Sequence, residues 1–357
     1  MKTLAIESSC DDTSLAIVQF DNNVFNIKKC LLHSQIENHR QYGGVVPELA
    51  SRLHEEKIVD LIQEIWIDEI KKVDFISYTC CPGLPWSLLV GKTATNTLSL
   101  FLEKEKVGIH HIYGHIFSIF AERNINDINF PLLVLTVSGG HNDMYIVTKN
   151  KDKNIENFQE KLIENYSFSE ENLLGQVGQF FVYKVWFTLD DAAWEAFDKV
   201  SKMLGWPYPW WKWISDKANL YNWNNENIFP RIWLKKDEFN FSFSGLKAQV
   251  NYKIQDLKKE YWEKLPEDII NKIAYEFQQA TIETLGKKLL KASKFFDIKN
   301  IALVGWVSAN SKLKQYINEN KDKFDIENFY TPIKNLYSTD NAAMIWVVGI
   351  LKKYFSS

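Results

Sequence analysis

Alternating and helically spaced apolar positions divide the first third of the chain into strands and helices. Alternation predicts a β-strand, because successive side chains point to opposite faces of a sheet. Apolar residues three and four positions apart predict a helix, because they share one face. In chain order, we expect strands at residues 3–7, 14–20, 24–32 and 74–80 and helices at 47–72 and 87–104.

The second half of the chain opens in the same style as the first. A polar turn at 8–13 separates the first two strands, and a polar turn at 138–142 separates strands at 131–137 and 144–148. This repetition favours a duplicated α/β unit with a cleft between two lobes. The other expected elements are an exposed connection at 149–165, helices at 190–204, 266–296 and 308–320, a loop at 208–213, a strand at 300–304 and a last helix capped by residues 338–341. Ser308 is the expected N-cap of its helix.

Two histidines on one short predicted helix form the most informative pair in the chain. His111 and His115 are four residues apart, so they lie on the same helix face, one turn above the other. Two imidazoles placed in this way can hold one metal ion. Ile112 takes the position of the glutamate in the H-E-x-x-H motif, which disfavours a metalloprotease. Two histidines on a helix surface remain the alternative.

One carboxylate near the end of the chain is able to complete such a metal site. Ser338 and Thr339 already offer oxygens that can cap the last helix, which leaves the Asp340 carboxylate free. Two histidines and one carboxylate, with open coordination positions, suit Fe(II) or Zn(II). An ordinary helix N-terminus is the alternative reading of Asp340.

Three further polar stretches have two readings each. Asp11 and Asp12 could serve a proton transfer or a hydrated cation, or they could form a solvated turn. The turn at 138–141 contains two glycines whose backbone N–H groups could approach a phosphate or carboxylate, or it could be an ordinary hairpin turn. Asp190, Asp191 and Asp198 are expected on one helix, where Asp191 and Asp198 share a face; either one of these two points at a ligand, or both are exposed helix charges.

Composition excludes several classes of protein. With 46% hydrophobic and 24% charged residues, the 357-residue chain is expected to be globular, soluble and large enough for two lobes. A net charge of −3 offers no broad basic surface, so nucleic acid would have to bind a local patch or another subunit. The N-terminus does not resemble a signal peptide, and no run approaches a membrane span. The four cysteines suggest no disulfide framework, so we expect a reducing cytoplasm.

Eight stretches, in order along nearly the whole chain, resemble the motifs of one family. They lie at 5–13, 42–52, 110–115, 137–141, 189–199, 241–247, 307–310 and 339–344. The chain resembles the tRNA adenosine threonylcarbamoyltransferases, the TsaD-type proteins formerly described as glycoprotease-like. The resemblance implies an α/β fold of the actin-like and Hsp70-like (ASKHA) class. We expect a first lobe at 1–125, a second at 126–337, and a C-terminal helix at 338–357 that returns to the metal site and the first lobe.

The resemblance also implies roles for individual residues. His111, His115 and Asp340 resemble the ligands of one divalent metal ion per subunit, expected to be Fe(II), with Zn(II) as the alternative. Asp11 resembles a catalytic group that handles the proton of the attacking amine. The remaining residues resemble positions that bind substrate: Thr136, Val137, Ser138, Gly139, Gly140, Asp198, Trp211, Ser215 and Asn310.

The implied reaction transfers a threonylcarbamoyl group from threonylcarbamoyl-AMP to the exocyclic amine of the adenosine at position 37 of tRNAs that read codons beginning with A. A Lewis-acidic metal would polarise the carbonyl and stabilise the developing oxyanion. The expected partners are tRNA, a TsaB-like paralogue and a TsaE-like ATPase. A sugar kinase of the same fold would not need all three metal ligands. A non-catalytic or degenerate paralogue in the same tRNA-modification complex is the remaining alternative.

Tryptophan is unusually frequent in the chain and glycine is scarce. The chain has 13 Trp and 15 Gly, whereas average usage predicts roughly 25 Gly at this length. Five tryptophans stand where the resembling family has glycine: Trp86, Trp194, Trp210, Trp211 and Trp306. Because an indole cannot replace glycine at a positive φ or beside a ligand phosphate, we hypothesise that these codons are UGA, read as glycine in the source organism. Genuine aromatic substitutions, in a degenerate paralogue, are the alternative.

Overall fold

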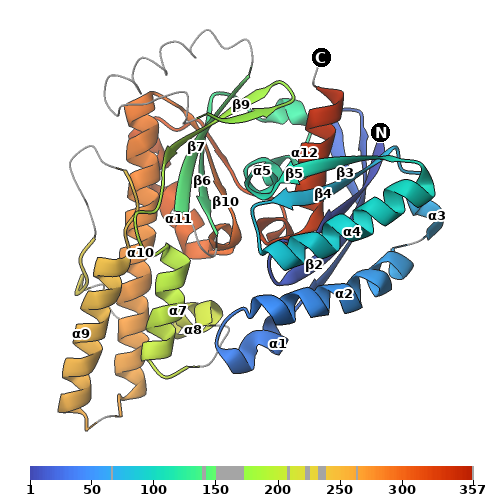
Figure 1. Cartoon of the computed structure of the whole chain (residues 1–357). Coiled ribbons are helices and arrows are strands. Elements are labelled where there is room, and N and C mark those ends of the chain that lie inside the picture. Colours follow the sequence, from blue (N-terminus) through green and yellow to red (C-terminus); the bar gives the residue numbers. More distant parts are fainter. Residues whose placement is uncertain are drawn as a thin grey trace.

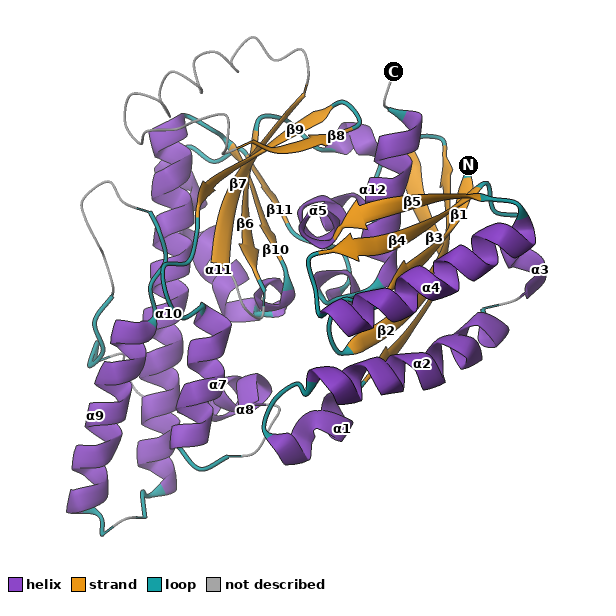
Figure 2. Cartoon of the chain, viewed as in Figure 1, coloured by secondary structure: helices purple, strands orange, loops and turns teal. Residues whose placement is uncertain are grey.

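The computed structural model describes residues 1–65, 67–138, 142–149, 173–206, 210–221, 226–231, 239–262 and 264–355. Two mixed β-sheets form the framework of the described chain, and helices flank each of them (Figure 1, Figure 2). No helix in these residues is both long enough and apolar enough to cross a membrane.

The first sheet has five strands in the order β3-β2-β1-β4-β5. They are β1 (Lys2–Glu7), β2 (Asp12–Asp21), β3 (Val24–Ser34), β4 (Phe75–Cys81) and β5 (Glu105–His110). The pairs β1–β2 and β2–β3 are antiparallel, and the pairs β1–β4 and β4–β5 are parallel. Leu4 and Ile6 pack under α2 (Pro47–Glu64) and α4 (Pro85–Leu102), whereas Ala5 packs on the other side with α12 (Ala342–Tyr354). Helices therefore bury both faces of β1, which explains the uninterrupted apolar run from Leu4 to Ile6.

The second sheet repeats this arrangement. Its strands are β6 (Leu132–Val137), β7 (Asn142–Lys149), β8 (Leu173–Val177), β9 (Phe180–Trp186), β10 (Asn300–Val304) and β11 (Asn328–Tyr330). The order is β11-β10-β6-β7-β9-β8, with β6–β7 and β7–β9 antiparallel and β6–β10 and β10–β11 parallel. When β6 is matched with β1, five strands have the same order and directions in both sheets, and β8 is an added edge. The predicted duplication of an α/β unit is confirmed.

Helices complete both halves of the molecule. In the first half these are α1 (Ile36–His39), α3 (Ile67–Ile70) and α5 (His111–Phe117), besides α2 and α4. In the second half they are α7 (Ala193–Met203), α8 (Trp210–Leu220), α9 (Ser244–Glu260), α10 (Glu267–Phe296) and α11 (Ser311–Asn320). α12 returns to pack on β1, β2 and α5, far from its neighbours in sequence (Figure 1). Short 3-10 turns link these elements, including η5 (Trp306–Ala309) and η7 (Asn335–Ser338).

The structure corrects three helix boundaries. The helix expected at 47–72 ends at Glu64 and is followed by the separate short helix α3. α7 begins at Ala193 and not at 190, because Asp190 accepts hydrogen bonds from Ser242 Oγ and Phe243 N and is held outside the helix. The loop expected at 208–213 gives way to α8 from Trp210 onward, since buried residues recur at helical spacing along that segment.

The N-cap of α11 is also different from the expected one. Ser308 lies in η5, and its hydroxyl donates to Ser338 Oγ at 2.7 Å. The cap is Asn310, whose side-chain oxygen accepts from Lys312 N at 2.9 Å and from Leu313 N at 3.1 Å. Strands β5, β8, β9 and β11 and helix α9 were not predicted. Residues 150–165 of the expected exposed connection lie outside the described residues, and Lys149 ends β7.

Candidate active site

Close packing of α5 on α12 places the two histidines beside Asp340. His111 is the first residue of α5, directly after β5, and Asp340 lies just before α12. A Cβ atom on Gly114 of α5 would come within 3.0 Å of Met344 and of Ile345 in α12. Glycine therefore permits the short distance between these helices. Asn341 Oδ1, and not Ser338 or Thr339 as the sequence suggested, caps α12 by accepting from Met344 N at 3.1 Å, which leaves the Asp340 carboxylate free of that task.

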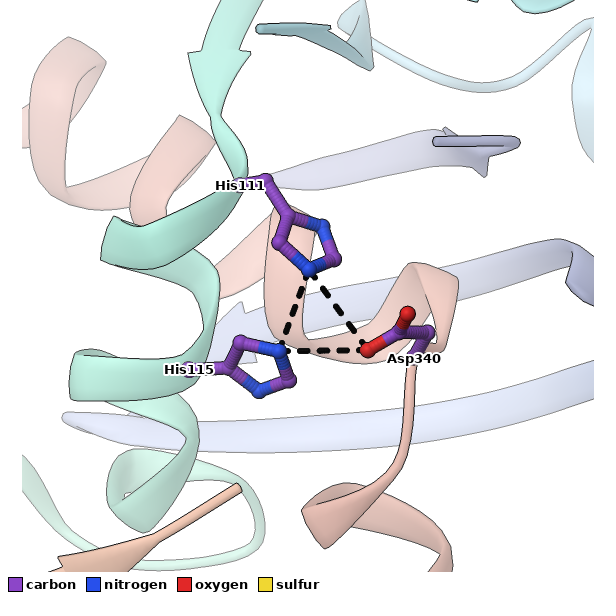
Figure 3. A group of neighbouring side chains, drawn as sticks. All are labelled: His111, His115 and Asp340. Atoms are coloured by element: carbon purple, nitrogen blue, oxygen red, sulfur yellow. Dashed lines mark hydrogen bonds and ion pairs between the residues drawn. The ribbon is translucent and has the colours of Figure 1, made fainter. Parts of the chain in front are cut away.

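His111, His115 and Asp340 converge on one point (Figure 3). The Nε2 atoms of the two histidines are 3.1 Å apart. Asp340 Oδ1 lies 3.1 Å from His115 Nε2 and 3.5 Å from His111 Nε2. Ligands about 2.0–2.2 Å from a shared ion, at tetrahedral or octahedral angles, lie about 3.0–3.4 Å from one another. The donor types and their spacing therefore fit one divalent ion, and these three residues can hold it.

A buried carboxylate behind His111 fixes the orientation of the imidazole. His111 Nδ1 lies 3.2 Å from Glu7 Oε2 and 3.1 Å from Ser9 Oγ. Glu7 is fully buried, and it also accepts hydrogen bonds from Ser9 N at 2.6 Å and from Thr79 Oγ1 at 2.5 Å. A carboxylate on Nδ1 leaves Nε2 for a metal, as in the carboxylate–histidine–metal arrangement of many metalloproteins.

The charges in this cluster stabilise one another. Burial opposes the cationic form of His111, but the carboxylates of Asp340 and Glu7 outweigh it and raise the pKa of His111 to about 10. Burial likewise opposes the carboxylate of Asp340, but the nearby His111 and His115 hold its pKa well below the usual range. His111 also lowers the pKa of Glu7 against the effect of burial. A cation is therefore favoured at this point, whether a proton or a metal ion.

The turn after β1 brings Asp11 into the same electrostatic environment. Burial raises the pKa of Asp11, the neighbouring thiol of Cys10 lowers it in part, and the Asp340 charge raises it further. Asp12 is buried, and burial together with the Asp11 charge raises the pKa of its carboxyl well above the usual value. Gln35 N donates to Asp11 O at 3.1 Å and so ties the turn to the start of α1. A half-buried carboxylate with a raised pKa suits the transfer of a proton.

A cavity of about 140 Å³ contains two of the predicted substrate-binding residues. Ser215 of α8 and Asn310, the N-cap of α11, both line it, together with the indoles of Trp194 and Trp306. Because Asn310 Oδ1 already accepts two backbone N–H groups, its Nδ2 is the group that is left to donate to a ligand. Asn310 can therefore recognise an acceptor, such as a ring nitrogen or a hydroxyl oxygen.

The end of β6 lies next to this cavity. Thr136 pairs with Val304 across β6 and β10, and a Cβ atom on Gly305 would approach Val137 O to 2.6 Å. Gly305 also has a φ of +84°, so glycine is required there for two reasons. This contact brings Thr136 and Val137 beside the start of η5. Ser138 follows directly, whereas Gly139 and Gly140 lie outside the described residues.

Asp198 and Trp211 are less closely connected with the cavity. Asp198 is on α7, four residues after Trp194 and thus on the same helix face. Burial, helped by the Glu195 charge, raises the pKa of Asp198 to about 7. Asp191 is not on that helix face, since it precedes α7 and pairs with Lys199 and Lys247. Trp211 belongs to α8, but its side chain is outside what the structure describes.

One hydrogen bond links the cavity with the metal-ligand cluster. Ser308 of η5 donates to Ser338 of η7, and both side chains are buried. Ser308 lies between the cavity residues Trp306 and Asn310, and Ser338 is two residues before Asp340. The two groups of predicted residues therefore belong to neighbouring, tied segments of the fold.

Sequence reasoning did not assign Glu7, Ser9 and Thr79 to the site. A signal for Glu7 was available, because it directly follows the apolar run from Leu4 to Ile6 at the end of a strand. A carboxylate at such a position is buried, and a buried carboxylate needs a cation or several donors.

Replacing Glu7 by glutamine keeps the size of the side chain but removes its charge. We expect Glu7→Gln to weaken metal affinity about ten- to hundredfold, because the imidazole of His111 loses its orienting carboxylate. Zn(II) titration of the purified protein measures this. Glu55→Gln, at an exposed position of α2, is the matched control and should bind Zn(II) like the unchanged protein. Equal affinities of the two variants would contradict the role given to Glu7.

Metal binding should be strongly dependent on pH. With a pKa of about 10, the metal-free His111 is protonated near neutral pH and must lose that proton to bind an ion. The dissociation constant for Zn(II) is therefore expected to fall by up to about tenfold for each unit of pH between 6.5 and 8.5. A constant affinity over this range, measured in non-coordinating buffers, would show that metal binding displaces no proton from His111.

Comparisons with known proteins agree with this geometry. The family model described as tRNA N6-adenosine threonylcarbamoyltransferase matches residues 26–347. A protein of that name from Kosmotoga olearia is 38% identical over 356 residues, covering 99% of this chain and 93% of the relative. One from Bacillus subtilis is 37% identical, covering 98% of this chain and 90% of the relative.

Solved structures show the same fold at much lower identity. The crystal structure of full-length HypF matches with a TM-score of 0.55 and 13% identity. The match covers 100% of this chain and 47% of the HypF chain. HypF from T. kodakarensis gives a TM-score of 0.52 at the same identity. The fold is the predicted actin-like and Hsp70-like (ASKHA) class. By its sequence over nearly its whole length, the chain belongs to the TsaD family of tRNA N6-adenosine threonylcarbamoyltransferases.

Proposed function

We propose that this protein transfers the threonylcarbamoyl group of threonylcarbamoyl-AMP to the exocyclic amine of adenosine 37 in tRNAs that read codons beginning with A. Membership of the family supports the class of reaction. The observation that carries the proposal is the convergence of His111, His115 and Asp340, with Glu7 directly behind His111. A non-catalytic paralogue would not need these metal-ligand residues.

The reaction is an acyl-type transfer. The amine nitrogen forms a bond to the carbamoyl carbon, the bond from that carbon to the phosphate oxygen breaks, and AMP leaves. One proton is lost from the amine. Because the lone pair of that amine is delocalised into the adenine ring, the carbonyl must be activated and its developing negative charge stabilised.

The metal proposed here is one divalent ion per subunit, Fe(II) or alternatively Zn(II), held by His111, His115 and Asp340. When bound, it supplies Lewis acidity toward the carbonyl and toward oxygens of the threonyl part. Glu7 and Ser9 keep the His111 imidazole oriented. Asp11 is close enough to be influenced by the Asp340 charge, and it accepts the proton of the amine.

The remaining proposed residues hold the substrate. Asn310 donates through Nδ2 and Ser215 through its hydroxyl from the walls of the cavity. The segment of Thr136, Val137 and Ser138 contributes from the end of β6, and we extend it to Gly139 and Gly140 from the sequence. Asp198 and position 211 are likewise assigned to substrate binding from the sequence.

The division of the chain and its surroundings complete the proposal. Lobes at 1–125 and 126–337, with a returning segment at 338–357, agree with the packing of α12 on β1 and β2. We propose a cytoplasmic protein, which is supported by four free cysteines. The proposed partners are tRNA, a TsaB-like paralogue and a TsaE-like ATPase.

Removing a proposed metal ligand should abolish transfer. His111→Ala and Asp340→Ala are each expected to lower the rate of transfer by at least about a thousandfold, because the Lewis acid contributes several kcal/mol. The assay combines tRNA, threonine, bicarbonate, ATP and the helper proteins, and circular dichroism verifies the fold. His33→Ala, on β3, is the control and should remain active. Full activity of either metal-stripped variant would exclude the assignment.

The isolated chain should bind tRNA weakly. A net charge of −3 provides no broad basic surface, so we expect a dissociation constant above about 1 µM at physiological salt. Adding the helper proteins should tighten binding, because they complete the tRNA surface. Fluorescence anisotropy with labelled tRNA measures both conditions. Tight binding by the chain alone would mean that a local basic patch is sufficient.

A further inference from the structure

Two indoles limit the size of the cavity that contains Ser215 and Asn310. Trp194 of α7 and Trp306 of η5 both line it, and the centroids of their rings are 6.3 Å apart. The volume of the cavity is about 140 Å³, whereas pockets for small molecules and cofactors occupy about 300–1,000 Å³. A nucleotide therefore does not fit while both side chains are present.

The residue directly before Trp306 is a glycine that the backbone requires. Gly305 has a φ of +84°, and a Cβ atom there would lie 2.6 Å from Val137 O. Trp306 follows at once, at the place where η5 passes the end of β6. The indole of Trp306 lies in the wall of the cavity and takes up space there.

A third tryptophan is unfavourable for an independent reason. Trp262 follows the end of α9, has a φ of +53°, and exposes 92% of its surface. The left-handed conformation just after a helix is the position at which glycine is most strongly favoured, because a Cβ atom is sterically unfavourable there. With its indole in solvent, Trp262 gains no packing that would offset this cost. Trp86, Trp194 and Trp306 lie in helical backbone. The argument that an indole cannot replace glycine at a positive φ therefore applies to Trp262 and not to these three tryptophans.

Composition agrees with these local observations. The 15 glycines and 13 tryptophans make 28 residues together, close to the roughly 25 glycines that a chain of this length normally has. The shortage of glycine matches the excess of tryptophan. This match indicates that UGA codons for glycine have been translated as tryptophan.

We propose that the protein made in its own cell carries glycine at positions 194, 262 and 306, encoded by UGA codons that this cell reads as glycine. Without the two indoles, the cavity is larger and receives the nucleotide part of the adenylate. The identity of that ligand rests on the proposed function, whereas the presence of glycine does not. For positions 86, 210 and 211, the proposal of glycine rests on the sequence alone.

Peptide sequencing by mass spectrometry decides the first half of the inference. The protein is purified from its own cells and digested, and the peptides that contain residues 194, 262 and 306 are sequenced. Glycine at all three positions is the expected result. Tryptophan at any of the three overturns the inference, and this result is independent of any activity.

Nucleotide binding decides the second half. Recombinant protein with Trp194→Gly and Trp306→Gly is compared with the chain as printed, using AMP as the probe in calorimetric titrations. We expect AMP affinity to rise at least about tenfold, because the cavity reaches the size of a nucleotide pocket. If the double glycine variant does not fold, Trp194→Ala with Trp306→Ala gives the same enlargement with less backbone freedom. Unchanged AMP affinity in a folded double variant overturns the role of the cavity.

Trp262→Gly is the matched control for that experiment. It should leave AMP affinity unchanged and raise the melting temperature by about 2 °C, because it relieves the left-handed backbone without touching the cavity. Trp262→Ala should give no such rise. Glycine in the native peptides together with AMP binding, but without transfer to tRNA, would refute the proposed function and leave this inference standing.

Discussion

The contact between Glu7 and His111 is the interaction on which the candidate site depends. It joins the end of β1 to the start of α5 and turns the Nε2 atom of His111 toward His115 and Asp340. A buried carboxylate without partners would cost several kcal/mol. Here Ser9 N and Thr79 Oγ1 donate to Glu7 and the imidazole faces it, so the charge becomes a means of orienting a ligand.

Duplication of the α/β unit explains where the functional residues lie. β1 and β6 occupy equivalent central positions in the two sheets, and each is followed by a polar turn. The turn after β1 carries Asp11 near the metal ligands, and the end of β6 brings Thr136 and Val137 to the cavity. α5 of the first half thus provides His111 and His115, the returning C-terminal segment provides Asp340, and the second half provides the surface proposed to hold the nucleotide.

The turn η5 and the segment just before Asp340 connect these halves. The hydrogen bond from Ser308 to Ser338 connects the cavity turn η5 with the residues just before Asp340. α12 then begins at Ala342 and packs back on the first sheet. The cavity turn and the segment that carries Asp340 are therefore held in direct contact.

The sequence alone predicted the central strands of both sheets through local periodicity, but it missed β5, β8, β9 and β11. Residue types at fixed spacing predicted the metal-ligand set and the family. It could not place Glu7 behind His111, since the two residues are 104 positions apart and meet only when β1 and β5 join one sheet. Nor could it identify Asn310 as a helix cap, because Ser308 offers the same chemistry and only tertiary packing directs its hydroxyl to Ser338. The short distance between α5 and α12 is likewise a property of the fold: Gly114 allows it, but only the packing of these two helices places His111 and His115 beside Asp340.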